Sequence, residues 1–405
     1  MSFDNTEFAF AYKSDKELKR AQFLFSSMGN SFLLHSGLKL MPIAMKFRLP
    51  FTKSLIRQTI FKQFVGGETL QQTAVVADKL WQYNVQVILD YGVEGGNDGE
   101  AGYEHATQEF INVINYAATQ TNIPFMSIKV TGIVRFELLE KIDSAMHSSE
   151  TTLLKRYYKV IGMLSIEEQD EWQRAVNRMI RICEIASRKN IGVLVDAEET
   201  WIQDPVDALT VLMMDTYNKE KAVVYNTIQL YRHDRLTFLK DCYEAATERQ
   251  FLLGAKLVRG AYMDKERRRA TELGYPSPIQ PDKETCDHDY NDAIEFCIEQ
   301  LQQIAVIIAS HNERSNLYAT QLLDEKGIQH NHPHIHFSQL YGMSDNITFN
   351  LARSGCSVSK YLPFGPIKEV VPYLLRRAQE NSSVSGQTGR ELGLIKREMD
   401  RRKIS

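Results

Sequence analysis

The sequence lacks the features that mark secreted, membrane-spanning and zinc-ribbon proteins. Its 405 residues include only five cysteines, which are widely spaced and form no Cys-x-x-Cys pair, so neither a disulfide framework nor a zinc ribbon is indicated. No uncharged apolar run reaches the roughly 18 residues that cross a bilayer, and the N-terminus shows no secretory signal pattern. We therefore expect a protein of a reducing compartment, without a transmembrane helix.

Acidic residues are missing from one long segment. Residues 18–67 contain eight basic residues and no acidic one, although the net charge of the whole chain is only -3. The pattern predicts a helical arm over residues 1–80, interrupted at Pro42 and Pro50. Its apolar part, residues 32–64, could lie on an anionic membrane surface or pack on the rest of the protein; a mitochondrial transit segment is a further alternative. The small net charge argues against nucleic acid as a partner.

From residue 85 onward, short apolar runs alternate with longer helical patterns. This alternation, with no Gly-x-Gly-x-x-Gly motif, predicts an α/β fold of the (β/α)8 TIM-barrel type rather than an open dinucleotide-binding sheet. We expect the barrel over residues 81–390, with a helical insertion at about 140–166 between strands two and three, and a tail over 391–405. The expected strands are 85–90, 125–131, 192–196, 222–229, 254–259, 305–310, 334–340 and 356–361.

Polar and ionisable residues stand at the ends of the expected strands, where the active sites of such barrels lie. The clearest pattern follows the last strand, where Tyr373, Arg376, Arg377 and Glu380 are offset by 0, 3, 4 and 7 positions. On a helix these residues share one face. Two adjacent guanidinium groups can clamp a carboxylate through paired donors, although a solvated Arg/Glu surface would show the same spacing.

With the segment Ala255-Lys-Leu-Val-Arg-Gly-Ala-Tyr262, the sequence resembles the proline dehydrogenase family, in its monofunctional branch. The resemblance covers roughly residues 85–385 in family order. The motifs that carry it are Ile88-Leu-Asp-Tyr-Gly-Val-Glu94, Ser127-Ile-Lys129, Val195-Asp-Ala-Glu-Glu199, Thr227-Ile-Gln-Leu-Tyr231, Lys256-Leu-Val-Arg-Gly-Ala-Tyr-Met263, Ser310-His-Asn312, Gln339-Leu-Tyr-Gly-Met343 and the block from Tyr361 to Asn381.

The resemblance implies a substrate site for L-proline. Arg376, Arg377 and Lys129 would bind the substrate carboxylate, and Glu94 would pair with the second arginine, because buried cations need a compensating charge. Asp196 would support this charge pattern. The resemblance makes Lys129, Asp196, Tyr361, Arg376 and Arg377 the expected catalytic residues. The residues expected to form a box around the proline ring are Tyr262, Leu340, Tyr361 and Tyr373; Tyr361 favours proline over 4-hydroxyproline, since relatives that prefer the latter tend to have a small residue there.

The resemblance also implies FAD as the cofactor. The protein would hold it and tune its electronics through cations and hydrogen bonds. Lys256 occupies a position that is often arginine in bifunctional members, so the environment of flavin N5 differs while a cation is kept. The residues expected to contact FAD are Gln229, Lys256, Val258, Arg259, Gly260, Ala261, His311, Asn312 and Glu380.

The implied activity is hydride transfer from L-proline to FAD, which gives Δ1-pyrroline-5-carboxylate. Electrons would pass to a membrane quinone, and a separate pyrroline-5-carboxylate dehydrogenase would oxidise the product, because no aldehyde dehydrogenase module follows in this sequence. We expect a cytoplasmic protein, peripheral on the inner face of the cell membrane if the arm binds lipid, and a mitochondrial one only in a eukaryote. Alternatives are a hydroxyproline dehydrogenase and a flavin- or proline-binding sensor without turnover.

Two further patterns carry alternatives of another class. Four histidines fall within residues 330–336, a spacing that could bind metal, although no Cys or Asp cluster accompanies them. A metal-assisted barrel lyase using Asp196, Glu198 and His311 is a separate alternative. The basic run 267–269 is interpreted as a solvated helix face rather than a nucleic-acid contact, and no metal is expected at the site.

Overall fold

The computed structural model describes residues 1–28, 52–92, 99–147, 152–383 and 387–404. Its strands are all parallel and form a closed barrel in chain order, which confirms the predicted fold class. Eight strands make up the barrel: β1 Gln86–Tyr91, β2 Phe125–Ile128, β3 Gly192–Val195, β4 Val224–Gln229, β5 Leu253–Val258, β6 Ile304–Ala309, β7 Ile335–Leu340 and β8 Val358–Phe364.

The strands form where the sequence is β-branched or apolar, and nearly every strand residue is buried. All six residues of β4 are buried, as are five of the six in β6, the pattern of a sheet covered on its outer face. Two ends differ from the prediction by three residues, more than the others do. The second strand ends at Ile128 rather than Thr131 because Val130–Gly132 turns into a 3-10 helix, η2. The eighth strand continues three residues further, to Phe364, still paired with β1.

The described chain divides into two compact units. Unit 1 contains Met1–Val93 and Phe337–Ser405, and unit 2 contains Glu94–His336. The helices of unit 1 are α1 Thr6–Ala9, α2 Asp15–Met28, α4 Thr52–Ile56, η1 Arg57–Phe61, α5 Lys62–Phe64, α6 Leu70–Trp81, α16 Asp345–Arg353, α17 Ile367–Ser383 and α18 Gln387–Arg401. The predicted breaks at Pro42 and Pro50 lie outside the described residues, and the division into arm, barrel and tail stays a prediction.

One apolar core holds the N-terminal and C-terminal helices of unit 1 together. Leu18, Ala21 and Phe25 of α2 recur at helical spacing and are at most 1% exposed. They pack in one cluster with Ile56, Phe61 and Phe64 and with residues of α17 and α18. Most described apolar residues of the basic segment are therefore buried inside unit 1, whereas Phe23 and Leu55 are 68% and 65% exposed.

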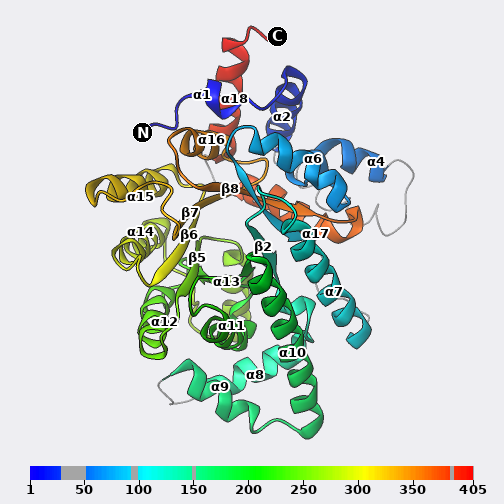
Figure 1. Cartoon of the computed structure of the whole chain (residues 1–405). Coiled ribbons are helices and arrows are strands. Elements are labelled where there is room, and N and C mark those ends of the chain that lie inside the picture. Colours follow the sequence, from blue (N-terminus) through cyan, green and yellow to red (C-terminus); the bar gives the residue numbers. More distant parts are fainter. Residues whose placement is uncertain (29–51, 93–98, 148–151, 384–386, 405) are drawn as a thin grey trace. The chain divides into compact units, whose positions relative to one another are not determined.

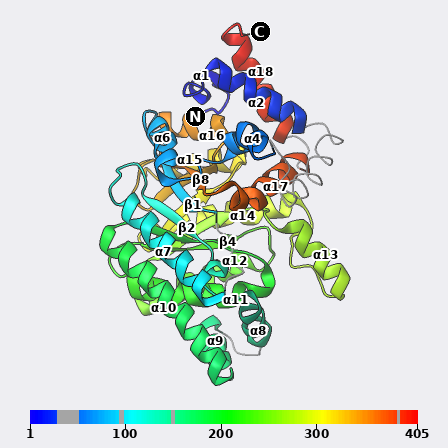
Figure 2. The ribbon, with the colours of Figure 1, turned by 90° about the vertical axis from the view of Figure 1, so that its right-hand side faces the viewer.

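Unit 2 contains β2 to β6 and the helices around them (Figure 1). These helices are α7 Gly99–Ala117, α8 Phe136–Met146, α9 Leu153–Ile161, α10 Ile166–Lys189, η3 Thr200–Ile202, α11 Gln203–Tyr217, α12 Arg235–Arg249, α13 Met263–Leu273, α14 Lys283–Glu299 and α15 Glu313–Glu325. Between β2 and β3 lie η2, α8, α9 and α10, and the latter three are seen in succession in Figure 2. No described helix is long and apolar enough to cross a membrane.

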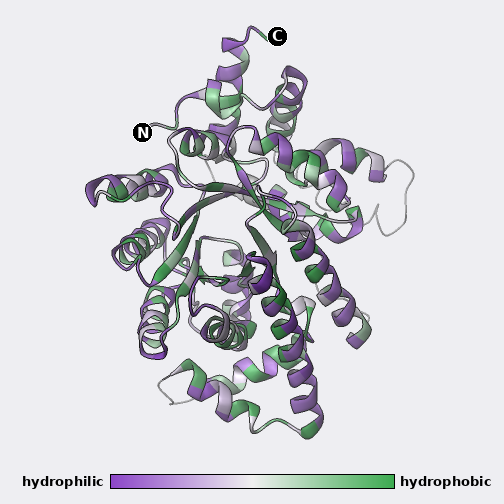
Figure 3. Ribbon diagram, viewed as in Figure 1, coloured by the Kyte–Doolittle hydropathy of each residue, from purple (hydrophilic) through white to green (hydrophobic). Residues whose placement is uncertain are grey.

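The longest helix shows how local sequence sets these elements. Ser165 and Glu168 form a reciprocal capping box at the start of α10, and Asn190 ends it in the left-handed conformation, a residue type that tolerates positive φ. Its buried residues include Trp172, Met179 and Ala186, each seven positions apart. The helix therefore presents one apolar stripe, and α10 shows both hydrophobic and hydrophilic residues along its length in Figure 3.

Candidate active site

Three charged side chains meet at the carboxyl ends of strands in unit 2. Lys129 follows β2 directly, Asp196 follows β3, and Lys256 lies within β5. Lys129 Nζ lies 3.6 Å from Asp196 Oδ2, while Lys256 Nζ pairs with Asp196 Oδ1. None of the three side chains is more than 13% exposed. The sequence predicted all three as site residues, and parallel strand ends bring them together.

The carboxylate in this group is held in its ionised form. Burial by itself would raise the pKa of Asp196, but the ammonium groups of Lys256 and Lys129, with hydrogen bonds from Lys256 and Ser127, lower that pKa below its ordinary value. The two ammonium groups therefore share one ionised carboxylate in a nearly dry environment. Cations held in this way can attract an anionic group.

A second carboxyl lies next to this group. Glu198 is 7% exposed, and its carboxylate accepts hydrogen bonds from Thr131 Oγ1 at 2.9 and 3.0 Å. Burial raises the pKa of Glu198 to about 7, although the charge of Lys129 acts in the opposite direction. A carboxyl with this pKa can accept or release a proton near neutral pH.

Gln229, expected at a flavin ring edge, is fixed by its own neighbours. Its amide nitrogen donates to the carbonyl of Glu198 at 2.7 Å and to the hydroxyl of Tyr231 at 2.8 Å. Its amide oxygen lies 3.4 Å from Nη1 of Arg232. Arg232 in turn forms a bidentate ion pair with Asp234. Both protons of the amide are therefore used within the protein, and the oxygen is the group with remaining capacity.

Arg259 is placed at the start of α15. Its two Nη atoms donate to Ser310 Oγ and Ser315 Oγ, each at 2.7 Å. Its guanidinium carbon lies 3.7 Å from the ring centroid of Tyr290, and its Nη2 lies 3.1 Å from Asp287. Among the described residues, its buried Nε has no hydrogen-bond partner. A fixed cation beside a helix N-terminus is a site for an anion such as a phosphate.

The other predicted flavin contacts surround Arg259. Val258 is the last residue of β5, and Gly260 follows with φ of +59°, a conformation that glycine adopts without strain. Asn312 caps α15, since its side chain accepts from Ser315 N at 3.3 Å. Ala261 is exposed and His311 is half-buried. The structure thus brings Val258 to Ala261 close to the start of α15 through the bonds of Arg259.

In unit 1, two predicted substrate residues are neighbours on adjacent strands. Leu340 of β7 is in register with Tyr361 of β8, and Gln339 is in register with Lys360. Lys360 contacts Asp345 and Gln339 accepts from Thr348, both on the outer helix α16. Because successive strand residues point to opposite faces, Leu340 and Tyr361 face the barrel interior.

The predicted arginine face lies on α17, which runs from Ile367 to Ser383 and includes all four residues of the pattern. Arg377 is 7% exposed and its guanidinium carbon lies 5.2 Å from the ring of Tyr373, while Arg376 is half-buried. A solvated surface would not bury Arg377. Glu380 lies within the helix, and Glu94 falls in 93–98, outside the described residues.

Unit 2 contributes the remaining ring-box residue. Tyr262 is half-buried and caps α13, whose Glu266 accepts from both the backbone nitrogen and the hydroxyl of Thr200 at 2.7 Å. That the residues of the two units together form one pocket stays a prediction.

Sequence reasoning missed several residues that hold these side chains, among them Tyr231, Arg232, Ser315 and Lys360. Lys360 had a visible signal, because a lysine inside an otherwise apolar strand must find a buried partner. The others carried no signal in the sequence.

The histidine segment does not gather into a metal site. His330 pairs with Asp324 at 2.8 Å and His334 contacts the carbonyl of Leu301 at 2.6 Å. His336 is buried against the ring of Phe125, and burial lowers its pKa to about 3. Within the described ranges, no group of three or more His, Cys, Asp or Glu side chains is arranged to hold a metal ion.

Comparison with known proteins gives consistent matches. Residues 74–390 match the family described as proline dehydrogenase. The chain is 32% identical over 374 residues to "Proline dehydrogenase 1, mitochondrial" of Dictyostelium discoideum, which covers 86% of this chain and 65% of the relative. It is 31% identical over 413 residues to "Hydroxyproline dehydrogenase" of Xenopus laevis, with 97% and 88% covered.

Solved structures show the same fold. Proline utilization A from Bdellovibrio bacteriovorus, inactivated by N-propargylglycine, superposes with a TM-score of 0.70 at 18% identity, over 95% of this chain and 39% of that chain. The chain thus spans less than two thirds of the Dictyostelium relative and well under half of the bacterial protein.

Proposed function

Because this chain belongs to the proline dehydrogenase family, we propose that it oxidises L-proline to Δ1-pyrroline-5-carboxylate with FAD as hydride acceptor. The observation that carries the proposal is the buried group of Lys129, Asp196 and Lys256 at the strand ends, in which two cations share one carboxylate. A substrate carboxylate would bind to those cations. The family supplies the identity of the substrate, and the group supplies a chemical reason for it.

The proposed contacts hold both the carboxylate and the ring of proline. Arg376, Arg377 and Lys129 bind the carboxylate, with Glu94 as the partner of Arg377. Buried Arg377, fixed against Tyr373, needs little reorganisation to do so. Tyr262, Leu340, Tyr361 and Tyr373 enclose the ring and exclude water. Asp196 keeps the two lysines charged and placed.

The residues around Arg259 fit FAD. The unsatisfied buried Nε of Arg259, its serine-held Nη atoms and the positive φ of Gly260 make a fixed cradle for a pyrophosphate. Bound there, FAD supplies the oxidising chemistry. Lys256 would place a cation near the flavin ring, Gln229 would offer its amide oxygen to a ring edge, and the further contacts would be Val258, Ala261, His311, Asn312 and Glu380.

The absorption spectrum of the purified protein tests this proposal. A flavin band that L-proline bleaches without oxygen supports it. A flavin that proline does not reduce indicates the sensor, and a colourless protein that fails to bind added FAD indicates the lyase. Arg376→Met and Arg377→Met should raise the KM for proline steeply while flavin stays bound. Arg397→Met, an exposed arginine of α18, is the matched control, and unchanged kinetics in both site variants would refute the carboxylate assignment.

Hydroxyproline is the second candidate substrate, because one relative of similar identity is named a hydroxyproline dehydrogenase. Tyr361 is in register with Leu340, and we propose that its ring takes up the volume that a ring hydroxyl would need. The ratio of kcat/KM for the two substrates decides, and a ratio in favour of hydroxyproline would overturn the assignment of proline.

We propose a membrane quinone as the electron acceptor, with the protein cytoplasmic and peripheral on the membrane. A separate pyrroline-5-carboxylate dehydrogenase would oxidise the product. Several relatives are named mitochondrial, a location proposed here only for a eukaryotic source. The basic segment 18–67, of which 29–51 lie outside the described residues, supports the lipid contact. Flotation with anionic but not neutral liposomes, lost at high salt, is expected; equal flotation with both would contradict it.

A further inference from the structure

A buried charged cluster in unit 1 lies directly behind the proposed substrate residues. Lys360 is fully buried, and its Nζ lies 3.0 Å from Asp345 Oδ1. The other carboxylate oxygen, Oδ2, lies 2.8 Å from Lys13 Nζ and accepts from Tyr12 Oη at 2.8 Å. We name Tyr12, Lys13, Asp345 and Lys360 the Lys360 cluster. It joins the N-terminal segment to β8 and to the start of α16.

The cluster also fixes the loop that follows β7. Lys360 Nζ donates to the carbonyl of Met343 at 2.5 Å and lies 3.4 Å from that of Leu340. Gln63 donates to the carbonyl of Gly342 at 2.7 Å. Side chains from β8 and from the N-terminal helices therefore bind three carbonyls within four residues.

The far end of the loop is held in the same way, since Ser344 N donates to Glu391 of α18 at 2.5 Å. The loop itself is shaped for these contacts. Gly342 has φ of +80°, and a Cβ there would lie 2.1 Å from the carbonyl oxygen of Gln63. No other residue type fits so close to that backbone.

The charges of the cluster explain why burial is tolerated. Burial alone would raise the pKa of Asp345, but Lys13 and Lys360 lower it to about 2. Removing one lysine leaves the Asp345 carboxylate with a single ammonium partner. Removing Lys360 also leaves the carbonyls of Leu340 and Met343 without their charged donor. Such losses are costly in a dry environment.

The loop and the strand next to it carry two residues of the proposed ring box. Leu340 is the last residue of β7 and its carbonyl faces Lys360, while Tyr361 is the next residue after Lys360 along β8. A shift of either backbone would move both side chains on the interior face. Tyr12 in turn stacks on Phe349 of α16, with ring centroids 4.5 Å apart, which ties the N-terminal segment to the same helix.

We infer that Lys360, Asp345 and Lys13 are positioning residues that fix Leu340 and Tyr361, so that the N-terminal segment sets substrate affinity and selectivity. The expected change in KM rests on the proposed function, whereas the expected change in hydrogen exchange of the loop does not. It gives Lys13, which lies far from the strand ends in the sequence, a defined effect on the substrate site.

Kinetics of matched variants test the inference. Lys360→Met should raise the KM for proline at least about ten-fold, which corresponds to about 1.4 kcal/mol, while kcat and bound flavin change little. Lys13→Met should act in the same direction with a smaller change, and Lys13→Arg should restore the wild-type KM. Both methionine variants should also lower the ratio of kcat/KM for proline to kcat/KM for 4-hydroxyproline.

Two controls separate positioning from simple loss of stability. Leu24→Ala opens a cavity in the same core of unit 1 and should lower Tm without changing KM. Hydrogen exchange of the backbone amides in residues 340–344 should be faster in both methionine variants and unchanged in Leu24→Ala. If Lys360→Met does not fold, Lys13→Met decides.

Wild-type exchange and KM in Lys13→Met would overturn the inference, as would an equal rise of KM in Leu24→Ala. A wild-type protein that does not oxidise proline would instead overturn the proposed function. The exchange of the loop amides would still report on the cluster in that case.

Discussion

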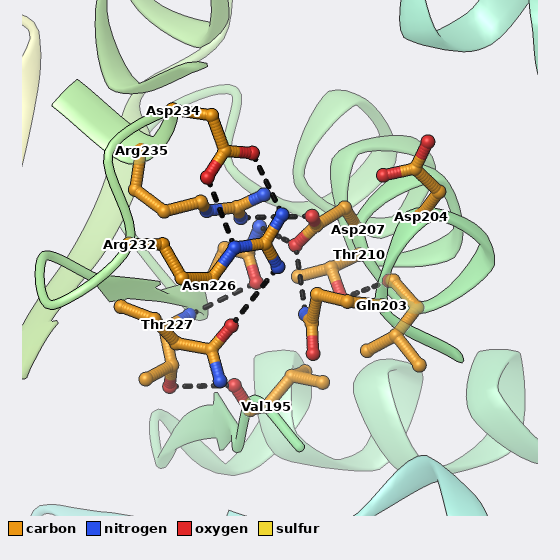
Figure 4. A network of polar contacts seen from close by, with 12 residues as sticks. Val195, Gln203, Asp204, Asp207, Thr210, Asn226, Thr227, Arg232, Asp234 and Arg235 are labelled. Atoms are coloured by element: carbon orange, nitrogen blue, oxygen red, sulfur yellow. Dashed lines mark hydrogen bonds and ion pairs between the residues drawn. The ribbon is translucent and has the colours of Figure 1, made fainter. Parts of the chain in front are cut away.

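The buried ion pair between Asp207 and Arg235 predicts a large loss of stability when one partner is removed. Arg235 Nη2 lies 2.8 Å from Asp207 Oδ2, and the two side chains are 1% and 0% exposed. Asp207 Oδ1 also accepts from Asn226 at 2.8 Å and from Gln203 at 3.0 Å. Figure 4 shows these side chains converging on Asp207. One carboxylate thus satisfies donors from β4, α11 and α12.

Asp207→Ala would leave a guanidinium and two amides buried without their acceptor. Breaking a buried pair by removing one partner costs about 3–5 kcal/mol. At about 2–4 °C per kcal/mol for a unit of this size, Tm should fall by about 6–20 °C. Thermal unfolding followed by circular dichroism, with urea unfolding as a second measure, gives the loss.

The control is Glu184→Ala, which removes an exposed partner of Arg188 in the same unit and should cost less than about 0.5 kcal/mol. The double variant Asp207→Leu with Arg235→Met replaces both charges by apolar groups and should recover much of the lost stability. A loss below about 1 kcal/mol for Asp207→Ala would refute the reasoning. So would a double variant whose loss equals the sum of the two single losses.

Three further predictions concern pH, cofactor and substrate. Burial raises the pKa of Asp143 from 3.8 to about 8, so the folded state binds more protons between those values and stability should fall as pH rises from about 4 to about 8. Asp143→Asn should flatten this slope in Tm measured at pH 5 and pH 8; an unchanged slope would contradict the assignment. Arg259→Met should weaken FAD binding by at least about ten-fold, since it removes charge-assisted bonds, and flavin fluorescence titration with wild-type affinity would argue against the cradle. Tyr361→Ser should raise kcat/KM for 4-hydroxyproline relative to proline by about ten-fold through a larger pocket; a constant ratio of the two would show that Tyr361 does not set selectivity.

Local sequence was enough for the fold class and for the elements that carry the site. The eight apolar runs correspond to the eight strands, because strands buried on both faces must be apolar along their whole length. The spacing of Tyr373, Arg376 and Arg377 placed them on one helix, as found in α17. Strand ends were less well predicted at Ile128 and Phe364, where a 3-10 turn and pairing with β1 decided the boundary.

The chemistry of the site depended more on tertiary contacts. The sequence indicated Lys129, Asp196 and Lys256 as separate strand-end residues, but it did not show that one carboxylate lies between two ammonium groups. Nor did it show that Gln229 has both amide protons bound within the protein. Asp196 lies tens of positions from both lysines, as Gln229 does from Glu198, so no local pattern records these contacts.

The residue types and motifs that the sequence lacks restrict the fold class, but they do not determine the environment of the basic segment. Few cysteines, no long apolar run and no dinucleotide-binding glycine motif limited the fold class, because composition and periodicity act over a few residues at a time. The basic segment 18–67 remained open between lipid contact and packing. Only tertiary structure decided that most of its described apolar residues belong to the core of unit 1, and that Lys13 beside it reaches Asp345, since burial depends on what lies opposite each side chain in space.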